Sequence, residues 1–214
     1  MKDTFFNLND VKQKRIIEAT LKEFALTGYE KTSIDMIVHR AGISKGGMYE
    51  YIVSKEDLFQ YALEHSYGSM FSYIQDRIMR DGSALPADPV ERTRLISAVA
   101  VEFYIENPVT IAFIVSASRV YQGPIRDRVT DVLDSYFDNL YKTCRFDGIV
   151  HDGQDILSLL KWLLIKTRND FQDKMETVGD VVVCRESYLD EWRFFLSVLS
   201  SGIYGGGKRP SAGK

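Results

Sequence analysis

The chain has 214 residues, of which 45% are hydrophobic and 27% charged, and its formal net charge is −3. This is ordinary globular composition, with enough residues for one or two domains with a sizeable core. No apolar run approaches the roughly 18 residues that span a bilayer, and the N-terminus lacks the apolar stretch of a secretory signal. Two distant cysteines, Cys144 and Cys184, argue against a disulfide scaffold and a zinc site, so we expect a cytoplasmic protein.

Charge is unevenly distributed along the chain. Residues 1–55 hold nine Lys and Arg against seven Asp and Glu, whereas the remainder is acidic. A mildly basic first quarter on an acidic body is typical of a small polyanion-binding head, because Lys and Arg reach phosphates. This charge difference is small, and by itself it does not establish that the first quarter binds a polyanion.

Helical periodicity predicts four helices in the first eighty residues. Ile17, Leu21 and Phe24 start one apolar stripe, and the fourth helix is expected to run to about Arg80. This region contains hydroxyl residues of the kind that cap helix N-termini, and glycines of the kind that end helices. In chain order these caps and stops are Gly28, Thr32 with Ser33, Gly42, Ser44 and Ser54.

The rest of the chain also reads as helical. After the linker Asp81–Pro86, helices are predicted near 88–106, 108–120, 124–145, 153–175 and 185–204. Val181–Val183 has β-like composition but is too short to seed a sheet, and the tail 205–214 is expected to be disordered. The sequence therefore predicts an all-α protein with about nine helices.

Two short helices joined by a tight turn give a helix-turn-helix layout over about residues 33–52. Small Ala41 and Gly42 let the second helix pack across the first. The helix that starts at Ser44 then projects its outer face, which fits a DNA major groove.

These residues resemble the DNA-binding head of the tetracycline-repressor (TetR) family. Some fifteen positions agree in order and spacing over about residues 10–70, with apolar departures at Val38 and Ile52. The matching segments are Ile17–Phe24, Gly28-Tyr29, Thr32–Ile34, Ile37, Ala41–Gly46, Tyr49–Tyr51 and Ser54–Leu58. The resemblance implies a DNA-binding domain over 10–70, an effector-binding and dimerisation domain over 71–204, and a tail over 205–214.

The resemblance also implies which residues meet DNA. Hydroxyls and amides at a helix N-terminus suit a phosphate, and Lys55 resembles a phosphate-clamping lysine. The alternatives are that Tyr49 packs the small domain and that Lys55 is a solvated surface lysine. The predicted DNA-binding residues are Thr32, Ser33, Ser44, Lys45, Gly46, Tyr49, Tyr51 and Lys55.

Two adjacent glycines, Gly46 and Gly47, lie inside the predicted recognition helix. Each costs roughly 1 kcal/mol of helix propensity, so we expect this helix to be partly unformed without DNA. The pair also leaves few side chains for base edges.

Two C-terminal helices carry the apolar residues expected of a dimer interface. The last helix repeats apolar residues at spacings of three and four, and the helix over 156–171 is apolar nearly all round. We expect these helices from two chains to form a four-helix interface, the alternative being that both faces are intrachain core. The predicted interface residues are Ile156, Leu160, Leu163, Leu189, Trp192, Leu196, Leu199 and Ile203.

Aromatic residues are dense between about residues 85 and 180. A helical bundle with several such rings can enclose an apolar cavity with polar handles, and the resemblance implies a small-molecule inducer there. The alternative is that these rings are simply core. The predicted pocket residues are Phe103, Tyr104, Phe113, Tyr121, Tyr136, Phe137, Tyr141 and Trp162.

The sequence contains no complete enzyme motif among those considered. Ser158–Lys161 fits an S-x-x-K pattern without its accompanying motifs, and the three histidines lie far apart, so no catalysis, metal or cofactor is expected. The sequence predicts a ligand-responsive repressor that binds a pseudo-palindromic DNA operator as a homodimer, is released by a small-molecule effector and has no membrane partner. The alternative is a helical ligand- or partner-binding module with lost or weak DNA affinity.

Overall fold

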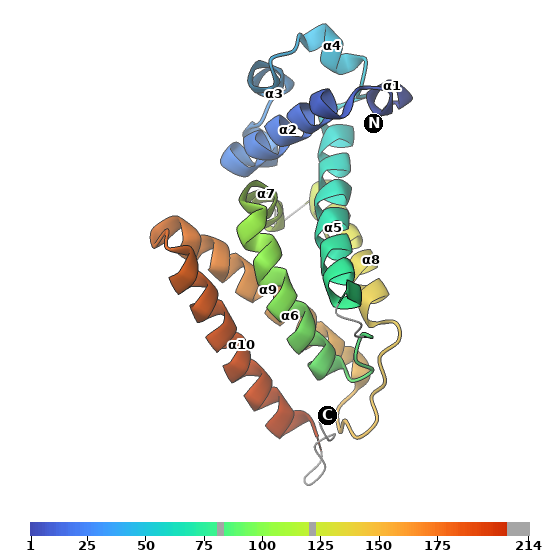
Figure 1. Cartoon of the computed structure of the whole chain (residues 1–214). Coiled ribbons are helices and arrows are strands. Elements are labelled where there is room, and N and C mark those ends of the chain that lie inside the picture. The colour runs from blue at the N-terminus through green and yellow to red at the C-terminus, as the bar shows by residue number, and fades with distance from the viewer. Residues whose placement is uncertain (81–83, 120–122, 205–214) are drawn as a thin grey trace. The chain divides into compact units, whose positions relative to one another are not determined.

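The computed structural model describes residues 1–80, 84–119 and 123–204, and these ranges contain ten helices and no strand (Figure 1). The all-α prediction is confirmed. Tyr121, the linker residues 81–83 and the tail 205–214 lie outside the described residues. The helices are α1 Asp3–Phe6, α2 Asp10–Lys31, α3 Ile34–Ala41, α4 Lys45–Tyr49, α5 Lys55–Arg80, α6 Pro89–Glu106, α7 Pro108–Ser118, α8 Pro124–Tyr141, α9 Gly153–Thr177 and α10 Val181–Ile203.

The predicted caps lie where the sequence places them. The hydroxyls of Ser33, Ser44 and Ser54 each accept a hydrogen bond from the amide three residues later, at 3.3, 3.0 and 3.1 Å. Gly28 and Gly42 have φ of 73° and 63°, the left-handed conformation that glycine adopts without strain. The serine caps and Gly42 therefore set boundaries of the first helices, whereas Gly28, predicted to end its helix, forms a kink inside α2, which continues to Lys31.

Two elements differ from the prediction. Helix α1 is an additional helix, which raises the number in the described ranges from nine to ten. Val181–Val183 forms the first turn of α10, because the Asp180 carboxylate accepts from the amides of Val182 and Val183 at 2.9 and 3.1 Å. A strong N-cap outweighs the β-propensity of three valines.

The described residues divide into two compact units. Unit 1 comprises residues 1–71 and 107–136, and unit 2 comprises 72–106 and the described residues from 137 on. The predicted functional division near residue 70 remains a prediction. In unit 1, α2 packs on α3 and α7 around a cluster of aromatic rings. The Phe24 and Phe59 centroids lie 5.0 Å apart, and Phe113 lies 5.5 Å from Phe59.

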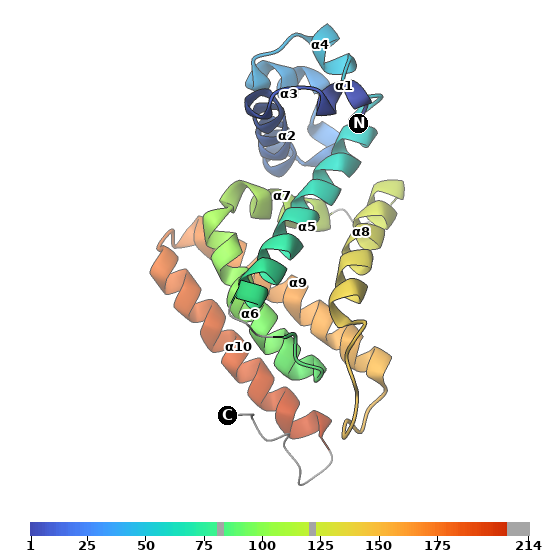
Figure 2. The same ribbon diagram turned by 45° about the vertical axis from the view of Figure 1, so that its right-hand side comes forward.

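In unit 2, α6 packs against both α9 and α10 (Figure 2). The rings of Tyr104, Phe171 and Tyr188 contact one another with centroids 5.7 to 5.9 Å apart. Buried Arg92 donates to the carbonyl oxygens of Pro86 and Leu140 and thereby ties the start of α6 to the end of α8. Each unit thus has its own core.

Candidate nucleic-acid interface

Helices α3 and α4 form the predicted helix-turn-helix. Gly42, in the left-handed conformation, joins them, while buried Ile37, Ala41 and Met48 form the core beneath. Because α4 packs through Met48, its other side is turned to solvent. The exposed residues on this outer face of α4 are Ser44, Lys45, Gly46 and Tyr49.

Lys45 is the exposed cation on this face. Its Nζ lies 2.9 Å from Asp35 Oδ2 on α3, and the hydrogen bond to this carboxylate raises the pKa of Lys45. Both side chains are well exposed, so a phosphate can replace Asp35 as the partner of Lys45. Ser33 is also exposed, at the start of α3. These positions agree with the predicted DNA-facing surface.

Thr32 is wrongly predicted as a phosphate contact. Its side chain is buried, and its Oγ1 donates to the Gly28 carbonyl at 2.7 Å and lies 2.6 Å from Thr27 Oγ1. The left-handed conformation of Gly28 turns the chain so that this hydroxyl satisfies backbone carbonyls. Thr32 therefore stabilises the α2–α3 turn.

Lys55 also holds this turn. Its Nζ donates to the carbonyl oxygens of Tyr29 and Thr32 at 2.8 and 3.1 Å and lies 4.3 Å from the centroid of the Tyr29 ring. The ammonium group is thus already bound by the protein. In place of the predicted phosphate clamp, the structure supports a role in fixing the start of α3.

We expect Lys55→Met to lower the free energy of unfolding by about 1–2 kcal/mol, because hydrogen bonds from a charged donor are lost. Operator affinity should fall without a change in its salt dependence. Thermal unfolding and DNA binding at several salt concentrations measure both effects. Unchanged stability with a salt slope reduced by about one would instead identify Lys55 as a phosphate ligand.

The two glycines of α4 are not equivalent. A Cβ atom built on Gly46 meets no atom within 4 Å, whereas one on Gly47 lies 3.1 Å from the Ser44 Oγ that caps the helix. We expect Gly46→Ala to stabilise the protein by about 0.4–1 kcal/mol, and Gly47→Ala to stabilise it less or to destabilise it. Urea midpoints of the two variants test this, and equal gains would show that the cap adapts freely.

Sequence reasoning missed the residues that precede α2. Tyr51, predicted to contact DNA, is half-buried; its hydroxyl accepts from Lys12 Nζ at 3.0 Å and its ring contacts fully buried Phe5. Residues 1–6 cover the C-terminal end of α4, where Lys2 and Thr4 donate hydrogen bonds. The adjacent pair Phe5-Phe6 is the one sequence signal that could have indicated this packing.

The predicted effector-pocket residues are distributed over both units. In unit 1, Phe113 contacts Phe24, and Tyr136 stacks on Phe71 with centroids 4.9 Å apart. The others among the described residues, Phe103, Tyr104, Phe137, Tyr141 and Trp162, belong to unit 2. All of these except Trp162 are buried, and the Trp162 ring is 57% exposed on α9, so it is not a core or pocket residue of its own unit. The remaining assignments stay predictions.

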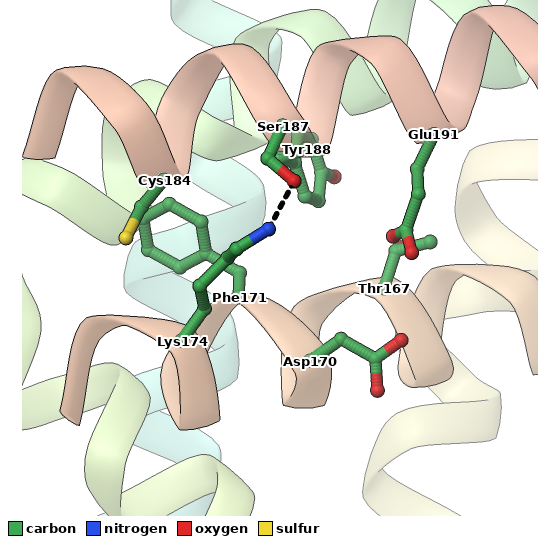
Figure 3. A pocket seen from close by; sticks show the side chains of 8 residues that line it. All are labelled: Thr167, Asp170, Phe171, Lys174, Cys184, Ser187, Tyr188 and Glu191. Atoms are coloured by element: carbon green, nitrogen blue, oxygen red, sulfur yellow. Dashed lines mark hydrogen bonds between the residues drawn. The ribbon is translucent and has the colours of Figure 1, made fainter. Parts of the chain in front are cut away.

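Figure 3 shows a crevice between α9 and α10 within unit 2. Lys174 Nζ donates to Ser187 Oγ across it. The crevice has a volume of about 40 Å³, which accommodates a water molecule but is far below the volume of an effector site. None of the predicted pocket residues lines it. Its lining residues are Thr167, Asp170, Phe171, Lys174, Cys184, Ser187, Tyr188 and Glu191.

The predicted dimer seam is intrachain core. Seven of its eight residues are buried within unit 2, where α9 and α10 pack with α6, and Leu189 is half-buried. A different apolar stripe is exposed. We call it the α9–α10 face; its residues are Leu159, Trp162, Phe194 and Val198. The periodicity correctly indicated a buried apolar stripe, but this stripe is buried by other helices of the same chain.

Within the described ranges, no three His, Cys, Asp or Glu side chains gather in a way that could hold a metal ion. In the same ranges, no single helix is long and apolar enough to cross a membrane. The consecutive helices α6 and α7 are long and apolar enough only when they are counted together as one bent pair.

Comparison with known proteins agrees with this geometry. Residues 16–62 match the family model described as bacterial regulatory proteins, tetR family. An uncharacterized HTH-type transcriptional regulator of Bacillus subtilis, YuxN, is 44% identical over 63 residues, 29% of this chain and 22% of that protein. YuxN and four other curated relatives are aligned over only 22–51% of their own length.

Solved structures share the fold over nearly the whole chain. A TetR family transcriptional regulator from Chloroflexus aurantiacus superposes with a TM-score of 0.67 at 23% identity, covering 95% of this chain and 98% of that one. FadR from Bacillus subtilis, solved in complex with stearoyl-CoA, superposes with a TM-score of 0.62 at 18% identity, covering 89% and 99%. At these identities the likeness shows the fold alone.

Proposed function

We propose that this chain is a member of the tetR family of bacterial regulatory proteins, whose model its residues 16–62 match, and that it represses transcription by binding a pseudo-palindromic DNA operator as a homodimer. A small-molecule effector releases the operator in this proposal. The protein acts in the cytoplasm and has no catalytic role. The observation that carries the proposal is the exposed outer face of α4, with Lys45 and Tyr49 turned to solvent and the helix fixed from below by Met48.

DNA binding is tested on duplexes selected from a random pool by the purified protein. We expect affinity to fall steeply as salt rises, because bound phosphates release counterions. Lys45→Gln should weaken binding and reduce the salt slope by about one. Lys22→Gln is the matched control, since Lys22 is also an exposed lysine paired with a carboxylate, that of Glu18. Failure to select any duplex, even at low salt, would refute the proposal.

The α9–α10 face supports the homodimer. Soluble proteins seldom leave large aromatic residues clustered in solvent, and Trp162 and Phe194 are both well exposed in the single chain. A twofold-related copy would cover the same face on both chains. In the proposed dimer the recognition helices enter successive major grooves about 34 Å apart.

Long-chain acyl-CoA is the first effector class to test, because FadR of similar fold was solved with stearoyl-CoA. If it is the effector, operator affinity should fall on its addition. The operator should reduce acyl-CoA affinity by the same factor, since coupling between two binding sites is reciprocal. Calorimetry with and without operator DNA measures this. A factor of one excludes this effector class without affecting the DNA-binding proposal.

One observation favours the alternative of a module with lost DNA affinity. Asp35 neutralises Lys45 on a helix whose other side chains for base contacts are few. Under that alternative, Asp35→Asn would leave the protein unable to bind any duplex. Under the proposed function the same change should strengthen binding and steepen its salt dependence, because Lys45 loses a competing partner.

A further inference from the structure

We propose that residues 1–6, here called the N-terminal clamp, hold the recognition helix α4 in its folded form before DNA arrives, with Lys2 and Thr4 as positioning residues. This inference rests on the proposed function, because the helix that the clamp orders is the one expected to enter the groove. No contact between the clamp and DNA is required.

Helix α4 needs outside support. It has five residues, two of them glycines, and an isolated helix of this length is unstable in water. Its N-terminus is capped by Ser44, whose hydroxyl accepts from the Gly47 amide at 3.0 Å. At its C-terminus, the last carbonyl groups of a helix have no partner within the helix.

The clamp supplies these missing donors. Lys2 Nζ donates to the Tyr49 carbonyl at 2.6 Å, Thr4 Oγ1 donates to the Glu50 carbonyl, and the Lys2 amide donates to the Tyr51 carbonyl at 2.8 Å. Three consecutive carbonyl groups, those of the last residue of α4 and of the two residues that follow it, are therefore satisfied by two residues of the clamp. These contacts join positions 46 to 49 residues apart in the sequence.

Buried groups anchor the clamp. Phe5 is fully buried, and its ring makes edge contacts with Tyr51 and Tyr61, with centroids 6.4 and 5.5 Å apart. The Met1 ammonium lies 2.8 Å from Asp57 Oδ1, while Asp57 Oδ2 accepts from the Val53 amide. Burial of this carboxyl opposes its ionisation, but the ammonium and the amide outweigh it and lower the pKa of Asp57. The clamp thus binds the turn after α4 as well.

The test compares the double variant Lys2→Met/Thr4→Val with wild type by hydrogen-exchange mass spectrometry of residues 44–52, without DNA. Phe5 stays in place, so unit 1 should still fold. We expect exchange to be about tenfold faster, because two helix-capping hydrogen bonds are lost. Lys14→Met, which removes a positive charge that is also exposed, from α2, should exchange like wild type. If the double variant fails to fold, Thr4→Val alone gives the same comparison with no change in charge.

Rescue separates positioning of α4 from general damage. Gly46→Ala adds helix propensity where nothing obstructs the new methyl group, so it should restore most of the lost protection in the double variant. Operator affinity of the double variant should fall, by less than the roughly tenfold change in exchange, with an unchanged salt slope, because a smaller fraction of the protein holds α4 folded.

Unchanged exchange in the double variant would overturn the clamp proposal. If the salt slope of DNA binding is also reduced, Lys2 is a phosphate ligand instead. Exchange is measured without DNA, so a protein that binds no duplex refutes the proposed function while the clamp is still tested. Normal DNA binding with unchanged exchange refutes the clamp alone.

Discussion

Phe194→Glu should convert the proposed dimer into monomers and lower operator affinity by at least about thirtyfold, the effect of losing one strong interface residue. The ring is 64% exposed in the single chain, so a carboxylate there is solvated in the monomer. In a dimer through the α9–α10 face the same carboxylate would be buried against Trp162 or its symmetry-related copy. Burying an unpaired charge is costly, and association is therefore lost while the fold is kept.

Light scattering and circular dichroism together measure this outcome. Val182→Glu is the matched control, because Val182 is 63% exposed on the same helix but lies about 120° around it from Phe194. This variant should remain dimeric. Trp192→Glu should instead unfold unit 2, because Trp192 is buried there. A Phe194→Glu protein that stays dimeric with full operator affinity would show that another face forms the interface.

The contrast between Trp192 and Phe194 shows what periodicity can and cannot predict. Spacings of three and four along α10 correctly indicate that one stripe is buried. They do not say whether the covering surface belongs to the same chain, because α6, which packs against α10, is far away in the sequence. Phe194 and Val198 belong to a second stripe, which can be recognised only once the structure shows that the first stripe is buried within the same chain.

Local signals in unit 1 were predicted best. The serine caps and the glycine turns act over three or four residues, and each is visible in the sequence. The structural roles of Lys55 and Thr32 could not be predicted from the sequence, because their partners are backbone carbonyls, which every residue type carries and no sequence pattern marks. The same holds for Lys2 at the end of α4.

Arg40→Met should destabilise unit 1 by about 2 kcal/mol, because it leaves a buried carboxylate without its cation. Glu23 on α2 is buried, and its Oε1 accepts from Arg40 Nε on α3 at 2.6 Å. The cost is below that of a fully buried pair because the Arg40 side chain is 39% exposed, so water reaches the guanidinium. The pair joins α2 to α3, and operator affinity should fall together with stability.

Urea unfolding of a double-mutant cycle tests this pair. Glu23→Gln should destabilise the protein on its own, but adding it to Arg40→Met should recover part of the loss, because the isolated charge is gone. Lys22→Met is the control: it breaks the exposed pair with Glu18 and should cost less than about 0.5 kcal/mol. If Arg40→Met behaves like Lys22→Met, water solvates Glu23 in the folded protein, and the α2–α3 contact is held by apolar packing around Ile37 and Phe24 rather than by this ion pair.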